Sequence, residues 1–422
     1  MRTTCFRERL GCSIRILKIF HLSSAPFNGG ASRAGFRIHQ AHLNESDVES
    51  VWINAERGAS GHNVFEIRNS ILKTPLIQHF KYKLWDKIIN TQIGVTSTLA
   101  TNPIGWGRIN HFNPFGVPDI WNLQWVARFL NWDTMLPWMA EQAPIVWTLH
   151  DLNPLSGIWH YEPQPEEHTP KRLKYEAEAI ELKKRALAKI PKDRLTFVGP
   201  SRWMVEECRK SSVTSGFRVE HIPYGLDTNL FSPRCNSLFK EVLGLPANKI
   251  VLGFVADRLN DPRKGIRQLL EAVENLLPKH PEIHLLIAGS GLGRNLGEIP
   301  HSSTGPLQND LLLSHFYSAC DFFVCPSLQD NLPNTVLESL ACGTPVVAFN
   351  TGGLPDMVIS GETGFLANMN ELNGALSDAL DFRKNRPDKF QEMKEFCRAK
   401  AMKEYSLEIQ AAKYKKLYAS MI

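Results

Sequence analysis

Two carboxylates, Asp330 and Glu338, flank the start of a short predicted helix in the segment SLQDNLPNTVLESLACGTPVVAF. A glutamate on a buried helix needs a partner, because an unpaired buried charge is costly. The amides that open this helix belong to Asn334, Thr335 and Val336. Free amides at a helix start bind phosphate and carboxylates accept hydrogen bonds from hydroxyls, so the segment suits a ligand such as a sugar nucleotide. The alternative is that Asp330 only caps the helix and Glu338 is an ordinary helical residue.

Two cations, Arg258 and Lys264, follow the apolar run IVLGFVA, and Gly265 then opens the next predicted helix. Cations at a strand end and a helix start can neutralise a diphosphate and stabilise the charge that grows on it as a leaving group. Arg263 could take the place of either cation. On spacing alone, these side chains could equally be solvent-facing surface charges.

The first half of the chain offers further candidates. Gly29 and Gly30 lie between an apolar run and a helical stretch, where glycines either let the backbone approach a ligand or form a tight turn. His150 and Asp151 end the run IVWTLHD, as ligand contacts or as a satisfied structural pair. In the second half, Gly289 belongs to IAGSGLG, whose glycine spacing does not match a dinucleotide fingerprint, so a Rossmann oxidoreductase is not predicted.

Short apolar runs alternate with helix-length segments along the chain. The strands and helices that they predict have to position all of the candidate residues. The runs cover 14–20, 118–126, 145–151, 195–201, 218–225, 250–256, 283–290, 321–327 and 344–350. Such runs predict parallel strands covered by helices on both faces. The predicted fold class is α/β, with two Rossmann-like doubly wound parallel-sheet domains that face each other across a cleft. Because ligands bind at the carboxyl ends of such strands, the candidate residues should lie in that cleft.

Composition sets limits on location and partners. The eight cysteines are scattered without zinc-ligand spacing, which favours a reducing, cytoplasmic location and no metal site. Arg15 and Lys18 interrupt the N-terminal apolar stretch, and no window reaches roughly 18 apolar residues, so neither a signal peptide nor a membrane span is predicted.

Residues 1–231 hold 28 Lys and Arg against 22 Asp and Glu, whereas residues 232–422 hold 20 against 21. Solvated helices explain this excess, and peripheral contact of the basic half with the inner face of a membrane is the alternative. Nucleic acid is not a predicted partner, because no stacking aromatic motif accompanies the basic residues.

Most of residues 250–367 resembles the donor-binding half of retaining glycosyltransferases of the GT-B fold, family 4. The resemblance rests on four segments in order: DRLNDPRKG, IAGSGLG, DFFVCPSLQDNLPNTVLESLACGTPVVAFNTGGLPDMV and GETGFLA. In the first half, TLHD is similar to the signature of bacterial exopolysaccharide members, of the colanic-acid type. Pro, Asn and Gly interrupt the pattern in LDTNLFSPRCNSLFKEVLGLPANK, which places a domain boundary near 231. The resemblance implies an acceptor-side domain at 1–231, a donor-nucleotide-binding domain at 232–404 and a helix at 405–422 that returns to the first domain.

The resemblance also implies roles for individual residues. Arg258 and Lys264 would hold the donor diphosphate, and Glu338 would hydrogen-bond the ribose. The loop around Asp330 would meet the sugar hydroxyls, and His150 would contact the transferred sugar. The glycines would line the donor, with Gly29 and Gly30 against its phosphate and sugar and Gly289 near its base.

The sequence departs from the family at three places. Asp330 stands where the family usually has Glu, and Tyr224 stands where it usually has Asn. The cysteine-rich insertion that often follows TLHD is replaced by GIWHYEPQPEEHTPKR. The sugar and the acceptor therefore stay open.

We expect retaining transfer of a sugar from a nucleoside-diphosphate donor to a glycan or lipid-linked acceptor, in exopolysaccharide or other surface-polysaccharide biosynthesis. Two fixed cations would serve the leaving group, so no cofactor or metal is expected. Glycoside hydrolysis is disfavoured, since it needs two opposed carboxylates and no diphosphate cradle. The remaining alternative is a catalytically silent GT-B protein that binds sugar nucleotides.

Overall fold

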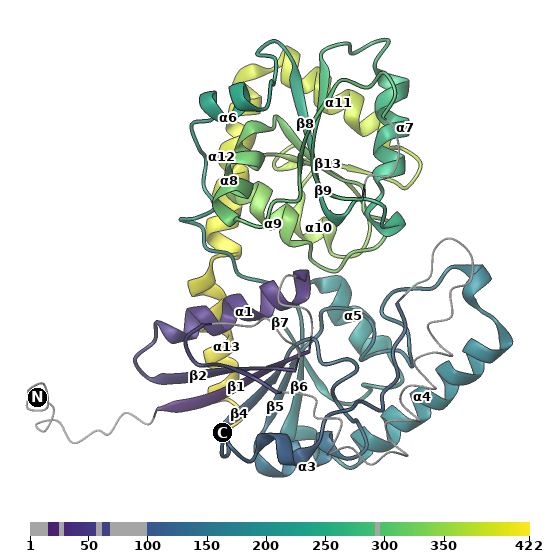
Figure 1. The fold of residues 1–422 in the computed structure, drawn as a ribbon, viewed down its shortest axis with the longest axis vertical. Helices are drawn as coiled ribbons and strands as arrows, with labels where there is room; N and C mark the ends of the chain where they lie inside the picture. Colours follow the sequence, from purple (N-terminus) through teal and green to yellow (C-terminus); the bar gives the residue numbers. More distant parts are fainter. Residues whose placement is uncertain (1–15, 25–28, 56–60, 68–98, 292–295) are drawn as a thin grey trace, which may run out of the picture.

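The computed structural model describes residues 16–24, 29–55, 61–67, 99–291 and 296–422. It contains two β-sheets, of seven and six strands, in which all neighbouring strands are parallel. Each sheet is the centre of one domain, and Figure 1 shows the first domain below the second. The prediction of two parallel α/β domains is therefore confirmed.

The first sheet has the strand order β3-β2-β1-β4-β5-β6-β7. Its strands are β1 (Leu17–Ser23), β2 (Val48–Asn54), β3 (Val64–Glu66), β4 (Ile120–Leu123), β5 (Ile145–Thr148), β6 (Leu195–Gly199) and β7 (Arg218–His221). Strands β2 and β3 escaped prediction, because Glu49 and Ser50 interrupt the apolar pattern of β2 and β3 has only three residues.

The second sheet has the strand order β10-β9-β8-β11-β12-β13. Its strands are β8 (Ile250–Arg258), β9 (Ile283–Ser290), β10 (His301–Gly305), β11 (Phe322–Cys325), β12 (Val346–Phe349) and β13 (Gly364–Ala367). The edge strands β10 and β13 escaped prediction. The sequence of β10, HSSTG, carries no large apolar residue.

Helices cover both faces of each sheet. Those of the first domain are α1 (Gly30–Leu43), α3 (Met135–Gln142), α4 (Pro170–Ala188) and α5 (Arg202–Lys210). Those that follow are α6 (Ser237–Val242), α7 (Ile266–Leu276), α8 (Asp310–Ala319), α9 (Asn334–Ala341), α10 (Leu354–Met357), α11 (Leu372–Asn385), α12 (Pro387–Glu404) and α13 (Leu407–Ala419). Along β8, Leu252 and Phe254 pack with α7 and α11, whereas Val251 packs on the other face with α8 and α9. This alternation explains why parallel strands read as continuous apolar runs.

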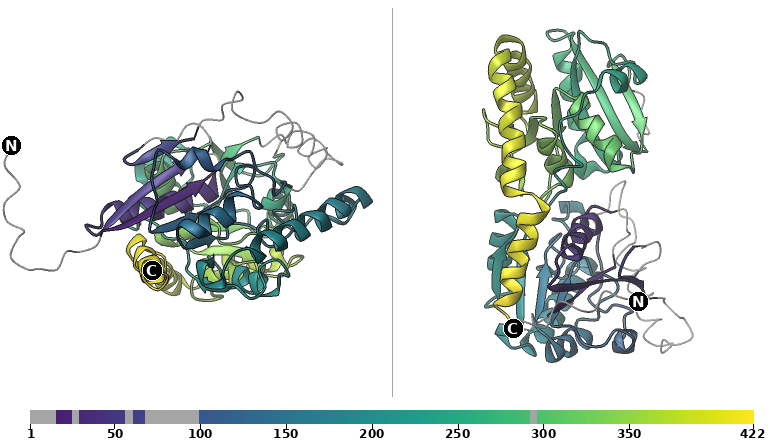
Figure 2. Two further views of the ribbon diagram at one scale, coloured as in Figure 1. Left: turned by 90° about the horizontal axis from the view of Figure 1, so that it is seen from below. Right: turned by 90° about the vertical axis from the view of Figure 1, so that its left-hand side faces the viewer.

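The chain crosses between the domains twice, and the two crossings are hydrogen-bonded to each other. The Leu226 amide donates to the Tyr405 carbonyl at 2.8 Å, and the Leu407 amide donates to the Leu226 carbonyl at 3.1 Å. Helix α13 then packs on the first sheet, where Tyr414 and Tyr418 are buried. Figure 2 shows α12 and α13 running along both domains.

Among the helices of the described ranges, none combines the length and the hydrophobicity that crossing a bilayer requires.

Candidate functional site

Lys264 and Asp330 meet where the second domain faces the first. Lys264 ends the 3-10 turn Pro262–Lys264 after β8, and its Nζ donates to Oδ2 of Asp330 at 2.5 Å. Burial raises the pKa of the Asp330 carboxyl, but Lys264 and Arg263 outweigh this and hold that pKa below its ordinary value. Asp330 is therefore ionised at neutral pH and can accept hydrogen bonds from hydroxyl groups.

Close backbone contacts fix this pair in place. Gly265 has φ 76°, and a Cβ there would lie 1.8 Å from the Pro326 carbonyl oxygen. A Cβ on Gly353 would lie 1.7 Å from the Asn331 carbonyl oxygen and 2.6 Å from the Cβ of Ser201. These positions need glycine because another backbone passes directly beside them. The lack of a side chain at Gly353 thus lets the Asp330 loop and Ser201 of the first domain pack closely against it.

Asn331 ties this loop to the carboxyl end of β5. Its Nδ2 donates to the carbonyl oxygens of Leu149 at 2.8 Å and His150 at 3.3 Å, while its Oδ1 accepts from Ser201 Oγ at 2.7 Å. Asn331 is buried, so these contacts lie inside the domain interface. The structure therefore brings the Asp330 loop and the His150 strand end together.

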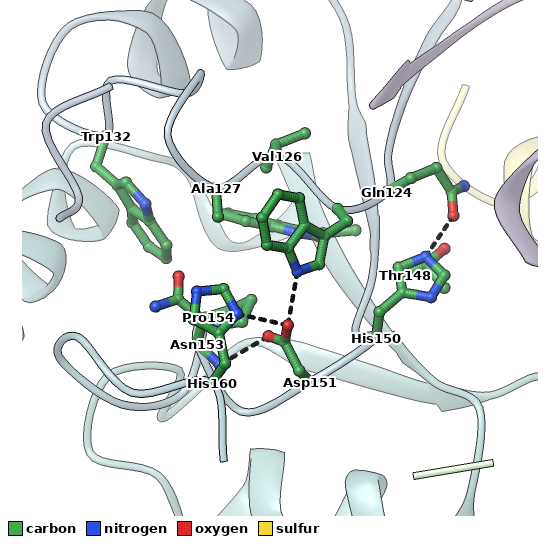
Figure 3. Close-up of a pocket in the computed structure, with 12 residues that line it drawn as sticks. Gln124, Val126, Ala127, Trp132, Thr148, His150, Asp151, Asn153, Pro154 and His160 are labelled. Atoms are coloured by element: carbon green, nitrogen blue, oxygen red, sulfur yellow. Dashed lines mark hydrogen bonds and ion pairs between the residues drawn. The ribbon is translucent and has the colours of Figure 1, made fainter. Parts of the chain in front are cut away.

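The side chain of His150 is bonded on both ring nitrogens. Gln124 Nε2 donates to Asn122, so Gln124 Oε1 is an acceptor and His150 Nε2 carries the proton that it shares at 2.9 Å (Figure 3). His150 Nδ1 then accepts from the Tyr224 hydroxyl at 2.7 Å. Burial lowers the pKa of His150 to about 4, which makes the ring neutral at neutral pH. A sugar can hydrogen-bond this ring only by replacing Gln124 or Tyr224.

A small pocket lies beside His150 and is built around Asp151 (Figure 3). Trp125 Nε1 and His160 Nδ1 both donate to Oδ2 of Asp151, at 2.7 and 2.6 Å, and the Asn153 amide donates to Oδ1 at 3.0 Å. The cavity volume of about 20 Å³ has room for a water molecule and none for a sugar. Asp151 therefore organises its own loop.

Helix α9 presents Glu338 to the domain interface rather than to an open space. Only 2% of Glu338 is exposed. Its Oε1 accepts from Arg37 Nη2 at 2.9 Å and its Oε2 accepts from the Tyr317 hydroxyl at 3.0 Å. The expectation of three free amides is wrong for Val336, because its amide donates to the Pro333 carbonyl at 3.1 Å. Asn334 and Thr335 are the partly exposed residues at this helix start.

The start of α1 lies opposite the start of α9. Gly29 caps α1, and the Gly30 carbonyl accepts from Asn334 Nδ2 at 2.9 Å. Arg37 Nη1 also donates to Asn334, at 3.2 Å, and Arg33 pairs with Asp310 at the start of α8. Sequence reasoning missed Arg33 and Arg37. Their four-residue spacing, on the helix that follows the two glycines, is a signal that could have identified them.

Arg258 and Gly289 lie at the ends of β8 and β9. Arg258 is exposed, and within the described part of the chain no hydrogen bond or ion pair joins it to Asp330. Arg263 occupies that place, with Nη1 at 3.6 Å from Asp330 Oδ2. Gly289 has φ 148°, and a Cβ there would lie 2.0 Å from the Ala256 carbonyl oxygen, so packing alone requires this glycine. Residues 292–295 of the same loop lie outside the described residues.

In the ranges that the structure covers, no three His, Cys, Asp or Glu side chains are grouped to hold a metal ion.

The two parallel-sheet domains define the class of fold, the GT-B fold. Residues 249–382 match the family described as "Glycosyl transferases group 1", so the second domain is a glycosyltransferase group 1 domain. D-inositol 3-phosphate glycosyltransferase of Corynebacterium jeikeium is 34% identical over 177 residues, which cover 37% of this chain and 40% of that protein. The sulfoquinovosyl transferase of Arabidopsis thaliana is 32% identical over 194 residues, which cover 43% of this chain and 36% of that protein. The chain thus spans about two fifths of the length of the curated relatives that it matches.

Solved structures resemble nearly the whole chain. Sucrose-phosphate synthase from Thermosynechococcus elongatus superposes with a TM-score of 0.68 at 18% identity, over 96% of this chain and 99% of that one. Anabaena HepE in complex with UDP-glucose superposes with a TM-score of 0.62 at 20% identity, over 96% and 100%. At these identities the likeness shows the fold alone, and the predicted GT-B fold is confirmed.

Proposed function

We propose that this protein is a retaining glycosyltransferase that moves a sugar from a nucleoside-diphosphate donor to a glycan or lipid-linked acceptor. The second domain would bind the donor and the first domain would bind the acceptor. No cofactor or metal is required by this proposal. Retention of the anomeric configuration is taken from the resemblance to family 4.

One observation carries the proposal. Lys264 and Asp330 are in contact at the interface between the domains, and Asn331, the next residue, bonds the backbone of His150. A cation, an ionised carboxylate and a strand-end histidine are thereby gathered at the carboxyl ends of parallel strands, where α/β folds bind ligands. A glycosyltransferase group 1 domain supplies most of these groups.

Each group has a task in this proposal. Lys264 would exchange Asp330 for the diphosphate oxygens and stabilise the charge that develops on the leaving group, where preorganised cations have their largest effect. Asp330 would then be free to accept hydrogen bonds from the sugar. Glu338 would bind the ribose after Arg37 leaves Oε1, so the donor and Arg37 would compete for this carboxylate.

The donor nucleotide is open among UDP, GDP and ADP. HepE was solved with UDP and with UDP-glucose, which favours a uridine donor as the first to test. The proposed role in exopolysaccharide or other surface-polysaccharide biosynthesis rests on the similarity of TLHD to the signature of bacterial exopolysaccharide members. A cytoplasmic location with peripheral membrane contact through the basic first domain would give access to a lipid-linked acceptor.

The test has two stages. Thermal unfolding is first followed with UDP, GDP, ADP and their common sugar nucleotides, because a ligand that binds only the native state raises the melting temperature. The best sugar nucleotide is then incubated without acceptor, and release of free sugar is measured for the wild type and for Lys264→Met. We expect a saturable shift with one nucleotide, and sugar release that Lys264→Met slows by a factor of roughly 100 or more.

Two results would contradict the proposal. An unchanged melting temperature with every nucleotide would show that the protein has no donor site. A shift without sugar release or transfer would favour the alternative, a catalytically silent sugar-nucleotide-binding protein.

A further inference from the structure

A tyrosine of the first domain covers a cation of the second. The guanidinium carbon of Arg263 lies 4.1 Å from the centroid of the Tyr161 ring, which is within cation–π distance. Tyr161 belongs to the loop that follows β5, and Arg263 belongs to the turn that carries Lys264. The two residues are about 100 positions apart in sequence. They belong to different domains and meet at the interface between them.

The Arg263 guanidinium contacts several partners at once. Its carbon lies over the Tyr161 ring, while Nη1 donates to the Gln329 carbonyl at 3.0 Å and lies 3.6 Å from Asp330 Oδ2. Nη2 is 3.3 Å from Asp261 Oδ2. A guanidinium that lies over a ring and is bonded through both terminal nitrogens has little freedom to rotate. Arg263 thus fixes the position of the loop that holds Asp330.

A second contact joins the same two segments. The Glu162 amide, next to Tyr161, donates to Gln329 Oε1 at 2.9 Å. Gln329 therefore receives hydrogen bonds from Arg263 of its own domain and from Glu162 of the other. The loop of Tyr161 and the loop of Asp330 are therefore joined by two contacts between neighbouring residues.

The loop that carries Tyr161 is held rigidly from its own side. Buried His160, next to Tyr161, donates to Asp151 at 2.6 Å and is bonded to Thr101 Oγ1 at 2.8 Å. On α4, the carboxylate of Glu176 accepts from the amides of Gly157 and Ile158, both at 2.6 Å.

Buried Lys183, also on α4, donates to the carbonyl oxygens of Asn153 at 2.5 Å and Ser156 at 3.1 Å. The loop therefore presents Tyr161 from a fixed base.

We propose that Tyr161 and Arg263 are a positioning pair for the proposed reaction. Tyr161 holds the Arg263 guanidinium, and Arg263 holds Asp330 beside Lys264. Because the pair spans both domains, it forms when they come together, and it makes the arrangement of the donor site depend on that contact. The proposal rests on the proposed function only for what Asp330 and Lys264 do.

The contact with Arg263 is made by the ring of Tyr161, so the variants must separate the ring from the hydroxyl. Tyr161→Phe keeps the ring and removes the hydroxyl, while Tyr161→Leu removes the ring. Phe217→Leu is the matched control, since Phe217 lies under Lys192 at 3.5 Å in a cation–π contact that involves neither Arg263 nor Asp330.

The first readout does not need activity. Trypsin cleaves after arginine and lysine, so mass spectrometry of brief native digestion reports how firmly the turn with Arg263 and Lys264 is held. We expect cleavage after these two residues to be about tenfold faster in Tyr161→Leu, and unchanged in Tyr161→Phe and in Phe217→Leu.

The second readout separates kcat from KM for sugar transfer or donor hydrolysis. We expect Tyr161→Leu to lower kcat about tenfold while KM for the donor changes less than about threefold, because the pair orients groups and does not bind the nucleotide. Tyr161→Phe should keep the wild-type kcat, and Phe217→Leu should do the same.

Two outcomes would contradict the proposal that Tyr161 and Arg263 are a positioning pair. Equal tryptic cleavage in Tyr161→Leu and the wild type would mean that Tyr161 does not hold Arg263. Equal loss of kcat in Tyr161→Phe and Tyr161→Leu would assign the effect to the hydroxyl instead of the ring. A wild type without any turnover contradicts the proposed function, and the digestion then decides the pair by itself.

Discussion

Arg37 of α1 and Glu338 of α9 form a buried salt bridge between the two domains, with 2.9 Å between Nη2 and Oε1. Only 7% of Arg37 and 2% of Glu338 is exposed. Arg33 lies 3.7 Å from the same oxygen, and Tyr317 bonds the other. The carboxylate that we propose to bind the donor ribose is therefore also in contact with the first domain.

Arg37→Ala should lower the free energy of unfolding by about 3–5 kcal/mol, because it leaves the Glu338 charge buried without its main partner. Urea titration of the variant and the wild type measures this difference. Arg202→Ala is the control, since Arg202 is exposed and lies 3.9 Å from Asp356 of the other domain, so its loss should cost less than about 1 kcal/mol. Equal stability of the Arg37 variant and the wild type would show that the bridge is not formed in solution.

Lys264→Met should lower the rate of sugar release or transfer by a factor of roughly 100 or more, the usual effect of removing one preorganised electrostatic group. Lys264→Arg keeps the charge and should recover part of the rate. The control is Lys279→Met, which removes an exposed lysine after α7. Steady-state rates with the donor identified by thermal shift provide the measurement, and an unchanged kcat in Lys264→Met would exclude this lysine from the reaction.

Gly35→Ala on α1 should disturb His150 indirectly, through Gln124, which lies between them. A Cβ on Gly35 would lie 2.7 Å from Gln124 Oε1 and 2.9 Å from its Cγ, so Gln124 must move away from His150. We expect a loss of about 1–3 kcal/mol of stability from overpacking, together with lower turnover.

Gly374→Ala is the matched control, because a Cβ there meets nothing within 4 Å and alanine should stabilise helix α11 by about 0.5–1 kcal/mol. Unchanged stability and turnover in Gly35→Ala would mean that Gln124 does not link α1 to His150.

Acid should destabilise the first domain through three buried histidines, His21, His39 and His42. Burial lowers the pKa of each, to about 4 for His39 and His42. These rings are neutral in the folded state, but the unfolded chain binds protons below the ordinary value of about 6.5. Stability present above pH 6.5 is therefore lost progressively as the pH falls toward 4.

His21→Leu should reduce this loss. Among the described residues, neither ring nitrogen of His21 has a hydrogen-bond partner, so leucine removes a titrating group without breaking a bond. Thermal unfolding at pH 7.5 and pH 5 measures the effect. His301→Leu serves as the control on an exposed histidine of the second domain. An equal drop in melting temperature for the wild type and His21→Leu would rule out His21 as a cause.

The strands that carry the site could be predicted because their signal is local. Each of β5, β8 and β11 is a continuous apolar run, since parallel strands are buried on both faces. Strand β10 gave no such signal because its sequence is HSSTG. Asp330 and Lys264 could be named because each follows one of these runs or its turn. Their contact could not be derived from spacing, as they lie 66 positions apart and meet only after β8 and β11 pair.

The sequence by itself determined the class of fold and the segments that carry the candidate site, because apolar periodicity and a contiguous motif are properties of neighbouring residues. Only the tertiary structure decided the partners. Glu338 meets Arg37, which is 301 positions away, and His150 meets Tyr224, which replaces the usual asparagine. The first pair depends on how the two domains pack against each other, and the second depends on how distant segments of the first domain pack together. The free energy of that packing comes from surfaces that no single segment contains.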